Sequence, residues 1–147
     1  MSARSLVARV PRGLCAAFFV GAGVLHFVRP ETYRPTVPPG FGDPSTVVLL
    51  SGVAEIAGGL ALLSAGGRRP ARWWLIALLV AVFPANLYMA LEPDQAGVSA
   101  IPGWLLWVRL PLQPLLVWWV WRVTTRPAAG GPGSCGSEDP LTVQSYT

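Results

Sequence analysis

Two ionisable side chains, Glu55 and Arg109, interrupt long apolar segments of this 147-residue chain. A charged side chain at the centre of a membrane span costs at least about 2.5 kcal/mol on insertion scales, so such a residue faces protein or water rather than lipid. Groups of this kind exchange protons, anchor a polar ligand or pair with each other. Further polar residues interrupt or border these apolar segments, and we predict that they share one pocket with the two charges: Asn86, His26, Ser51 and Gln113.

The depths of the two charges predict that they can meet. At 1.5 Å per helical residue, Arg109 lies roughly 9 Å and Glu55 roughly 14 Å from the outer ends of their segments. An arginine side chain bridges that difference. Two interpretations stay open: a structural Glu55–Arg109 clasp, and a ligand or proton pocket in the outer half of the molecule. Ser51 shares a helix face with Glu55, and Gln113 shares one with Arg109, because each pair is four residues apart.

Other site chemistries find little support. The chain has one His and two Cys, Cys15 and Cys135, without a C-x-x-C pair, so neither a His-based metal site nor a Ser-His-Asp arrangement is predicted. Glycine-rich phosphate-binding patterns are absent from the sequence. We therefore predict no catalytic residues and no metal, and we do not expect the chain to be an enzyme on its own.

Four apolar blocks must position these side chains, at about residues 13–28, 46–65, 71–91 and 103–123. The last three are close to the ~20 residues that a helix needs to cross a bilayer. The composition, 52% hydrophobic and 12% charged, agrees. We predict an all-α integral membrane protein, a four-helix bundle in which Gly21 and Gly52 let the first two spans approach closely.

The arginines predict the orientation of this bundle. Lys is absent, and Arg residues gather before the first block, between the second and third, and after the fourth. The positive-inside rule then puts both termini in the cytoplasm of a multi-pass plasma-membrane protein. The net charge of +4 is explained in this way, and no basic run interleaved with aromatic residues indicates nucleic acid. Tryptophans near the ends of the third and fourth blocks are typical of membrane–water interfaces.

The predicted organisation is one membrane domain, residues 1–126, with a disordered cytoplasmic tail at 127–147 that is rich in Pro, Gly and Ser at its start. Residues 29–45 carry five prolines, which predicts a stiff extracytoplasmic connection without helix or strand. Its end, Asp43-Pro44, is typical of a helix N-cap followed by proline at the first helical position.

Several stretches resemble the DoxX-like family of small four-helix bacterial membrane proteins. They are residues 23–27 (GVLHF), 29–31 (RPE), 50–63, 81–89 (AVFPANLYM) and 109–113 (RLPLQ). The resemblance covers about residues 13 to 123. It implies a role beside quinone-linked oxidation in a complex with partner subunits, and it carries over no catalytic residue.

Three functions are compatible with these observations. The expected one is an accessory or structural membrane subunit of a redox or oxidative-stress complex, whose partners are the lipid bilayer and other protein subunits. The alternative is a quinone-linked oxidoreductase component with quinone as the cofactor in the outer pocket. The weaker alternative is a small-solute carrier, since carriers commonly contain paired repeats and none is visible here.

Overall fold

The computed structural model describes residues 3–64 and 66–125, with side chains from Val10 onward, and this part of the chain contains helices and no strand. The prediction of an all-α fold is confirmed. In chain order the elements are α1 (Ala3–Val28), α2 (Pro30–Tyr33), the 3-10 turn η1 (Arg34–Thr36), α3 (Pro44–Ala61), α4 (Arg68–Leu91) and α5 (Gly103–Thr125).

Three helices of the described part are long and apolar enough to cross a membrane. They are Val10–Val28 of α1, α3 and α4, and only 22% to 28% of the residues in these segments are buried within the chain. Large apolar side chains such as Leu50 and Val80 are 64% and 65% exposed, as expected for helices that face lipid. α5 has the length of a span, but its Arg, Gln, Pro and Trp residues lower its mean hydropathy. A fourth span therefore stays a prediction.

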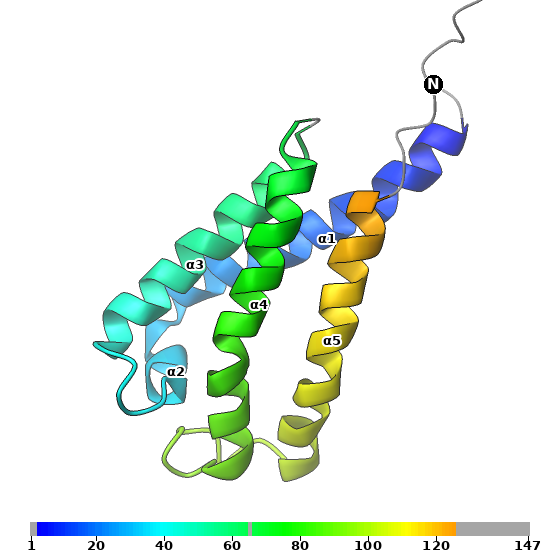
Figure 1. Ribbon diagram of the computed structural model, residues 1–147. Coiled ribbons are helices and arrows are strands. Elements are labelled where there is room, and N and C mark those ends of the chain that lie inside the picture. Colours follow the sequence, from blue (N-terminus) through cyan, green and yellow to red (C-terminus); the bar gives the residue numbers. More distant parts are fainter. Residues whose placement is uncertain (1–2, 65, 126–147) are drawn as a thin grey trace, which may run out of the picture.

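The four long helices pack in two antiparallel pairs, α1 with α3 and α4 with α5, and contacts between α3 and α4 and between α1 and α5 join the pairs (Figure 1). The beginning of α1, the α3–α4 turn and the end of α5 lie at one end of the molecule, which we name the terminal end. α2, η1 and the α4–α5 connection lie at the other end, which we name the loop end.

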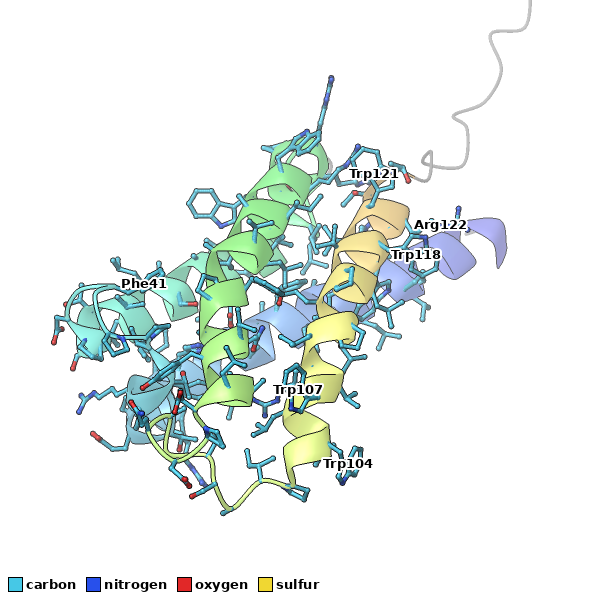
Figure 2. All side chains as sticks on the ribbon, turned by 60° about the horizontal axis from the view of Figure 1, so that its bottom comes forward. Phe41, Trp104, Trp107, Trp118, Trp121 and Arg122 are labelled. Carbon is cyan, nitrogen blue, oxygen red and sulfur yellow. The ribbon has the colours of Figure 1, made fainter. Side chains whose placement is uncertain are left out.

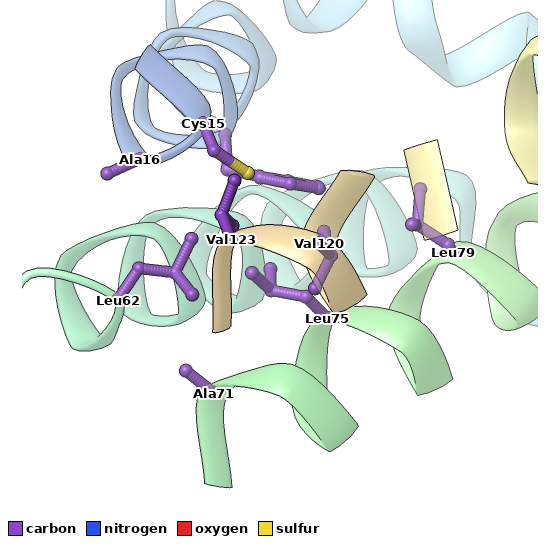
Figure 3. Packing of buried hydrophobic residues seen from close by; sticks show 9 residues of the cluster. Cys15, Ala16, Leu62, Ala71, Leu75, Leu79, Val120 and Val123 are labelled. Atoms are coloured by element: carbon purple, nitrogen blue, oxygen red, sulfur yellow. The ribbon is translucent and has the colours of Figure 1, made fainter. Parts of the chain in front are cut away.

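A buried apolar cluster joins the four long helices (Figure 3). It is built on fully buried side chains that include Cys15 of α1, Leu75 of α4, Val120 of α5 and Leu62, which directly follows α3. A smaller cluster at the loop end ties α4, α5 and their connection together. Because these clusters fix both ends of the α4–α5 pair, side chains between them are held at defined positions.

α1 and α3 approach most closely at two glycines. A Cβ atom on Gly23 would come within 2.6 Å of the Gly52 carbonyl oxygen, and one on Gly52 would come within 3.0 Å of the Gly23 carbonyl oxygen. The predicted role of Gly52 is confirmed. The prediction for Gly21 is wrong, since a Cβ there would meet nothing within 4 Å. Two residues turn a helix by about 200°, so Gly21 lies on the opposite face of α1 from Gly23.

The connection between α1 and α3 contains helix, contrary to the sequence prediction. Pro30 opens α2, and Pro35 lies in the first positions of η1. At the start of a helix proline removes no hydrogen bond and its fixed φ suits the helix, so these prolines permit the short helices that they were expected to exclude. The predicted cap of α3 is confirmed, because the Asp43 carboxylate accepts hydrogen bonds from the backbone N–H and the hydroxyl of Thr46, both at 2.8 Å.

We expect this cap to make a pH-dependent contribution to stability. The Thr46 hydrogen bonds hold the pKa of Asp43 below its usual value of 3.8. A lowered folded-state pKa means that the contribution is complete above the unfolded-state pKa and is lost as pH falls through the folded-state value. The Asp43→Ala change should therefore lower the melting temperature in detergent at pH 7, and its deficit should shrink toward pH 2. Asp43→Asn, which retains a capping side chain, should melt close to the unchanged protein at pH 7. A deficit for Asp43→Ala that stays constant with pH would contradict this account.

Exposed tryptophans mark both ends of α5 (Figure 2). Trp104 and Trp107 lie at the loop end, and Trp118 and Trp121 lie at the terminal end. At the terminal end they contact arginines: the guanidinium of Arg122 lies 5.7 Å from the Trp118 ring centre, and another arginine guanidinium lies over Trp121. Indole side chains prefer the headgroup level of a bilayer. The predicted tail at 127–147 lies outside the described residues.

Candidate functional site

A cavity of about 310 Å³ lies at the loop end, between the four long helices and the segment formed by α2 and η1. Most of its wall is apolar, from residues such as Val48 and Phe41. Five of the six predicted site residues line it, and they come from α1, α3, α4 and α5: His26, Ser51, Glu55, Asn86 and Arg109. The tertiary structure therefore brings together polar groups that are up to 83 positions apart in the sequence.

The side chains of His26 and Glu55 lie beside each other across α1 and α3. Nδ1 of His26 lies 3.6 Å from Oε2 of Glu55, and each side chain is 13% exposed. The same nitrogen lies 2.9 Å from the Ala22 carbonyl oxygen in the preceding turn, so a hydrogen on Nδ1 is directed mainly to that carbonyl. The ring of Tyr33 stacks on the imidazole with centroids 4.2 Å apart. Backbone and ring contacts thus fix the orientation of His26.

The close approach of α1 and α3 explains why these two side chains meet. The position of a Cβ on Gly23 is 3.1 Å from the Cβ of Glu55, and that of a Cβ on Gly52 is 2.9 Å from the Cβ of His26. Each glycine faces one member of the pair on the opposite helix. A larger residue at either glycine would push the helices apart and separate the imidazole from the carboxylate.

The cavity wall contains polar atoms without a partner. Oε2 of Glu55 and Oγ of Ser51 are both buried and receive no hydrogen bond from the described residues. Such atoms are rare in folded proteins, because a buried polar group without a partner costs about 1–3 kcal/mol. Ser51 and Glu55 line the cavity through their other atoms, because these two oxygens are closed off from solvent.

The expected Glu55–Arg109 clasp is not formed. Among the described residues the side chain of His26 lies beside Glu55, with Nδ1 3.6 Å from Oε2, and the guanidinium of Arg109 instead lies 3.4 Å from the sulfur of Met89. A thioether is a weak acceptor, so this contact satisfies little of the hydrogen-bonding capacity of a guanidinium with five N–H groups. The sequence argument compared depths and could not include the rotation of each helix about its axis, which here directs Glu55 toward α1.

Gln113 is the one predicted site residue that does not line the cavity. It is buried, with 5% of its surface exposed, and it accepts a hydrogen bond of 3.1 Å from Nδ2 of Asn86. Its own Nε2 donates to the carbonyl oxygen of Leu79 in α4. Pro84 interrupts the backbone hydrogen bonding of α4 near this point. Gln113 therefore ties α5 to α4 behind the cavity and holds Asn86 in place.

Sequence reasoning missed Tyr33, which lies in the connection that was expected to lack helix. Burial is the main cause that raises the pKa of Tyr33, the negative charge of Glu55 raises it further, and Arg109 lowers it. The phenol is therefore protonated at neutral pH and can donate a hydrogen bond at the cavity. Proline at position 30 followed by a polar turn was the available signal, because proline favours the first position of a helix.

The fold and the cavity together define an all-helical protein with membrane-length apolar helices and a partly polar cavity at one end. In the described part of the chain no three His, Cys, Asp or Glu residues cluster as metal ligands would. The chain belongs to a family described as a domain of unknown function, DUF8561, whose model matches residues 14–124. Neither a curated protein nor a solved structure matches the chain.

This family assignment corrects the resemblance to the DoxX-like family, which is wrong. Most of the stretches that carried the resemblance lie in apolar helices, where a few residue types recur under the shared demand of burial in lipid. Similarity of such segments reflects a common solvent as readily as common descent. The redox role that the resemblance implied loses its basis with it.

Proposed function

We propose that this chain is a membrane-embedded binding protein for a small amphiphilic molecule, which it holds in the cavity at the loop end. The observation that carries the proposal is the cavity itself: about 310 Å³, with a largely apolar wall and several polar groups directed into one space. Pockets for small molecules have this character and begin at about 300 Å³. The guanidinium of Arg109 supports the proposal further, because its hydrogen bond in the described part of the chain goes to the Met89 sulfur, a weak acceptor, and a ligand would supply a stronger one.

The same proposal includes four spans with both termini in the cytoplasm of a plasma-membrane protein. Arg68, Arg72 and Arg122 belong to the terminal end, whereas Glu31, Asp43, Glu92 and Asp94 belong to the loop end. The positive-inside rule favours the terminal end for the cytoplasm. The cavity then faces the extracytoplasmic side, and α2 with η1 forms part of its cover.

We expect reporter fusions to test this orientation. A reporter joined after Thr147 should behave as cytoplasmic, and one inserted near Pro39 should behave as extracytoplasmic. Alkaline phosphatase and a fluorescent protein give opposite readouts in the two compartments, so each insertion controls the other. The reverse pattern would overturn the topology. If both reporters lay in the same compartment, an even number of spans would separate Pro39 from Thr147, and α5 would be excluded as a fourth span.

Three other functions stay proposals with less support from the described residues: an accessory subunit, a quinone-linked component and a small-solute carrier. The accessory-subunit proposal no longer has the support of a Glu55–Arg109 clasp. A role beside partner subunits does not require that contact. A quinone in the cavity would find N–H donors on Arg109 for its ring carbonyls and an apolar wall for its ring.

The proposal is tested by what the protein retains. The full chain is purified in a mild detergent at native expression level, and native mass spectrometry with extraction of the bound fraction identifies small molecules. We expect one class of molecule at a stoichiometry approaching one per chain. As a control, the Val48→Trp change should fill the cavity and abolish retention, because Val48 lines it and is buried. Equal retention by both proteins would place the molecule elsewhere, and a stoichiometric protein partner without any small molecule would favour the accessory subunit.

A further inference from the structure

Apart from the imidazole of His26, whose Nδ1 is directed mainly to the Ala22 carbonyl oxygen, the polar wall of the cavity holds one cationic and one anionic side chain that form no ion pair with each other. Arg109 contributes a guanidinium whose one hydrogen bond to a described side chain goes to the sulfur of Met89. Glu55 contributes a carboxylate whose Oε2 lacks a hydrogen-bond donor. Both residues line the same cavity, and they are not in ion-pair contact. The cavity therefore offers donors on one side and an acceptor on the other.

This arrangement constrains the charge of a ligand. An anion alone would satisfy Arg109 and would be repelled by Glu55, whereas a cation alone would satisfy Glu55 and would be repelled by Arg109. In a poorly hydrated site such uncompensated charge is costly. A molecule without net charge that carries both an acceptor and a donor satisfies both side chains.

We infer that the cavity binds a small amphiphile of zero net charge whose polar end presents an acceptor to Arg109 and a hydrogen-bond donor to Glu55. The inference rests on the proposed binding function and specifies its ligand class. The apolar body of the ligand lies against the wall formed by residues such as Val48, Val82 and Ile101.

Two kinds of molecule have this chemistry: a zwitterion such as an apolar amino acid, and a neutral hydroxylated ring such as a quinol. The first places a carboxylate at Arg109 and an ammonium at Glu55. The second places one oxygen as acceptor at Arg109 and a hydroxyl as donor at Glu55. Binding alone is inferred, and no electron or proton transfer is needed for either.

The test compares matched probes on the full chain in lipid nanodiscs, by calorimetry under anaerobic conditions. Norleucine is compared with hexanoate and hexylamine, which have the same carbon count and only one of its two charged groups. Durohydroquinone is compared with duroquinone, which lacks the hydroxyl donors. We expect at least about tenfold tighter binding of norleucine or of durohydroquinone than of its matched probes, since a hydrogen bond to a charged group contributes about 1.5–3 kcal/mol. The pair that shows the difference identifies the source of the ligand.

Variants assign the two ends of the ligand. Glu55→Gln should bring the affinity for norleucine down to that for hexanoate, and Arg109→Gln should bring it down to that for hexylamine. Glu92→Gln and Arg122→Gln remove the same charges from exposed positions outside the cavity and should leave binding unchanged. If the donor-bearing probe is the quinol, Glu55→Gln should abolish its advantage over duroquinone, whereas Arg109→Gln should weaken the binding of both probes, because both carry an acceptor oxygen.

The outcomes separate this inference from the proposed function. Binding without a difference inside both probe sets, norleucine equal to hexanoate and hexylamine and durohydroquinone equal to duroquinone, would overturn the inference and leave the binding function standing. Binding of none of the five probes would likewise overturn it, while retention of a native molecule by the purified protein would still support the binding function. A purified protein that retains no molecule and binds no probe would overturn both.

Discussion

The Gly23→Val change should reduce the free energy of unfolding by about 3 kcal/mol, because overpacking of a close backbone contact forces the helices apart. The added Cβ would meet the Gly52 carbonyl oxygen and the side chain of Ile56 at 2.6 and 2.8 Å. One of these neighbours is backbone, which cannot rotate away as a side chain can. The consequence extends to the cavity, because the same contact holds His26 beside Glu55. We expect both a lower melting temperature and weaker binding of the retained molecule.

Gly21→Val is the matched control for this prediction. It lies in the same helix, introduces the same side chain and makes the same change in helix propensity, but its Cβ would meet nothing within 4 Å. The free energy of unfolding of the control should therefore stay within about 0.5 kcal/mol of that of the unchanged protein, as is usual for positions without a packing role. Thermal unfolding in detergent, followed by tryptophan fluorescence, measures both variants. Equal destabilisation by the two changes would show that the close approach of α1 and α3 at Gly23 is not required.

The second large effect is expected at Gln113, where a change to Leu should cost about 1–2 kcal/mol. Leucine fills a similar volume, so the loss comes from hydrogen bonds rather than from a cavity. It leaves Nδ2 of Asn86 without its acceptor and the Leu79 carbonyl oxygen without the side-chain donor. Asn86 lines the cavity, so release of its side chain should also alter ligand retention.

A double-mutant cycle with Asn86→Leu isolates this interaction. Each single change leaves one polar partner buried, whereas the double change removes both, so the double variant should lose less stability than the sum of the two single variants. Gln95→Leu, at an exposed position in the α4–α5 connection, is the control and should change stability little. Additive losses would contradict a coupled Asn86–Gln113 pair.

Hydropathy and capping signals in the sequence were sufficient to predict the positions of the long helices. The apolar blocks lie within the observed helices apart from the last residues of the block at 46–65, and the cap at Asp43 is where its residue type predicts it. These features are local: the length of an apolar run and the type of a capping residue act within a few turns of the chain. The same locality explains the error at Pro30, where proline was treated as a helix breaker although its position at the start of a helix makes it compatible with one.

The candidate residues could also be identified from the sequence, because a charged residue in an apolar segment of membrane length is rare and faces protein or water. The sequence did not predict which of these residues contact each other. Whether Glu55 meets His26 or Arg109 depends on the rotation of α3 about its axis, and that rotation is set by the contact of Gly23 with Gly52 across two helices. Composition and spacing thus determined the helices and the set of polar residues. Only tertiary packing decided the partners of these residues, because steric fit between distant segments selects the helix faces that meet.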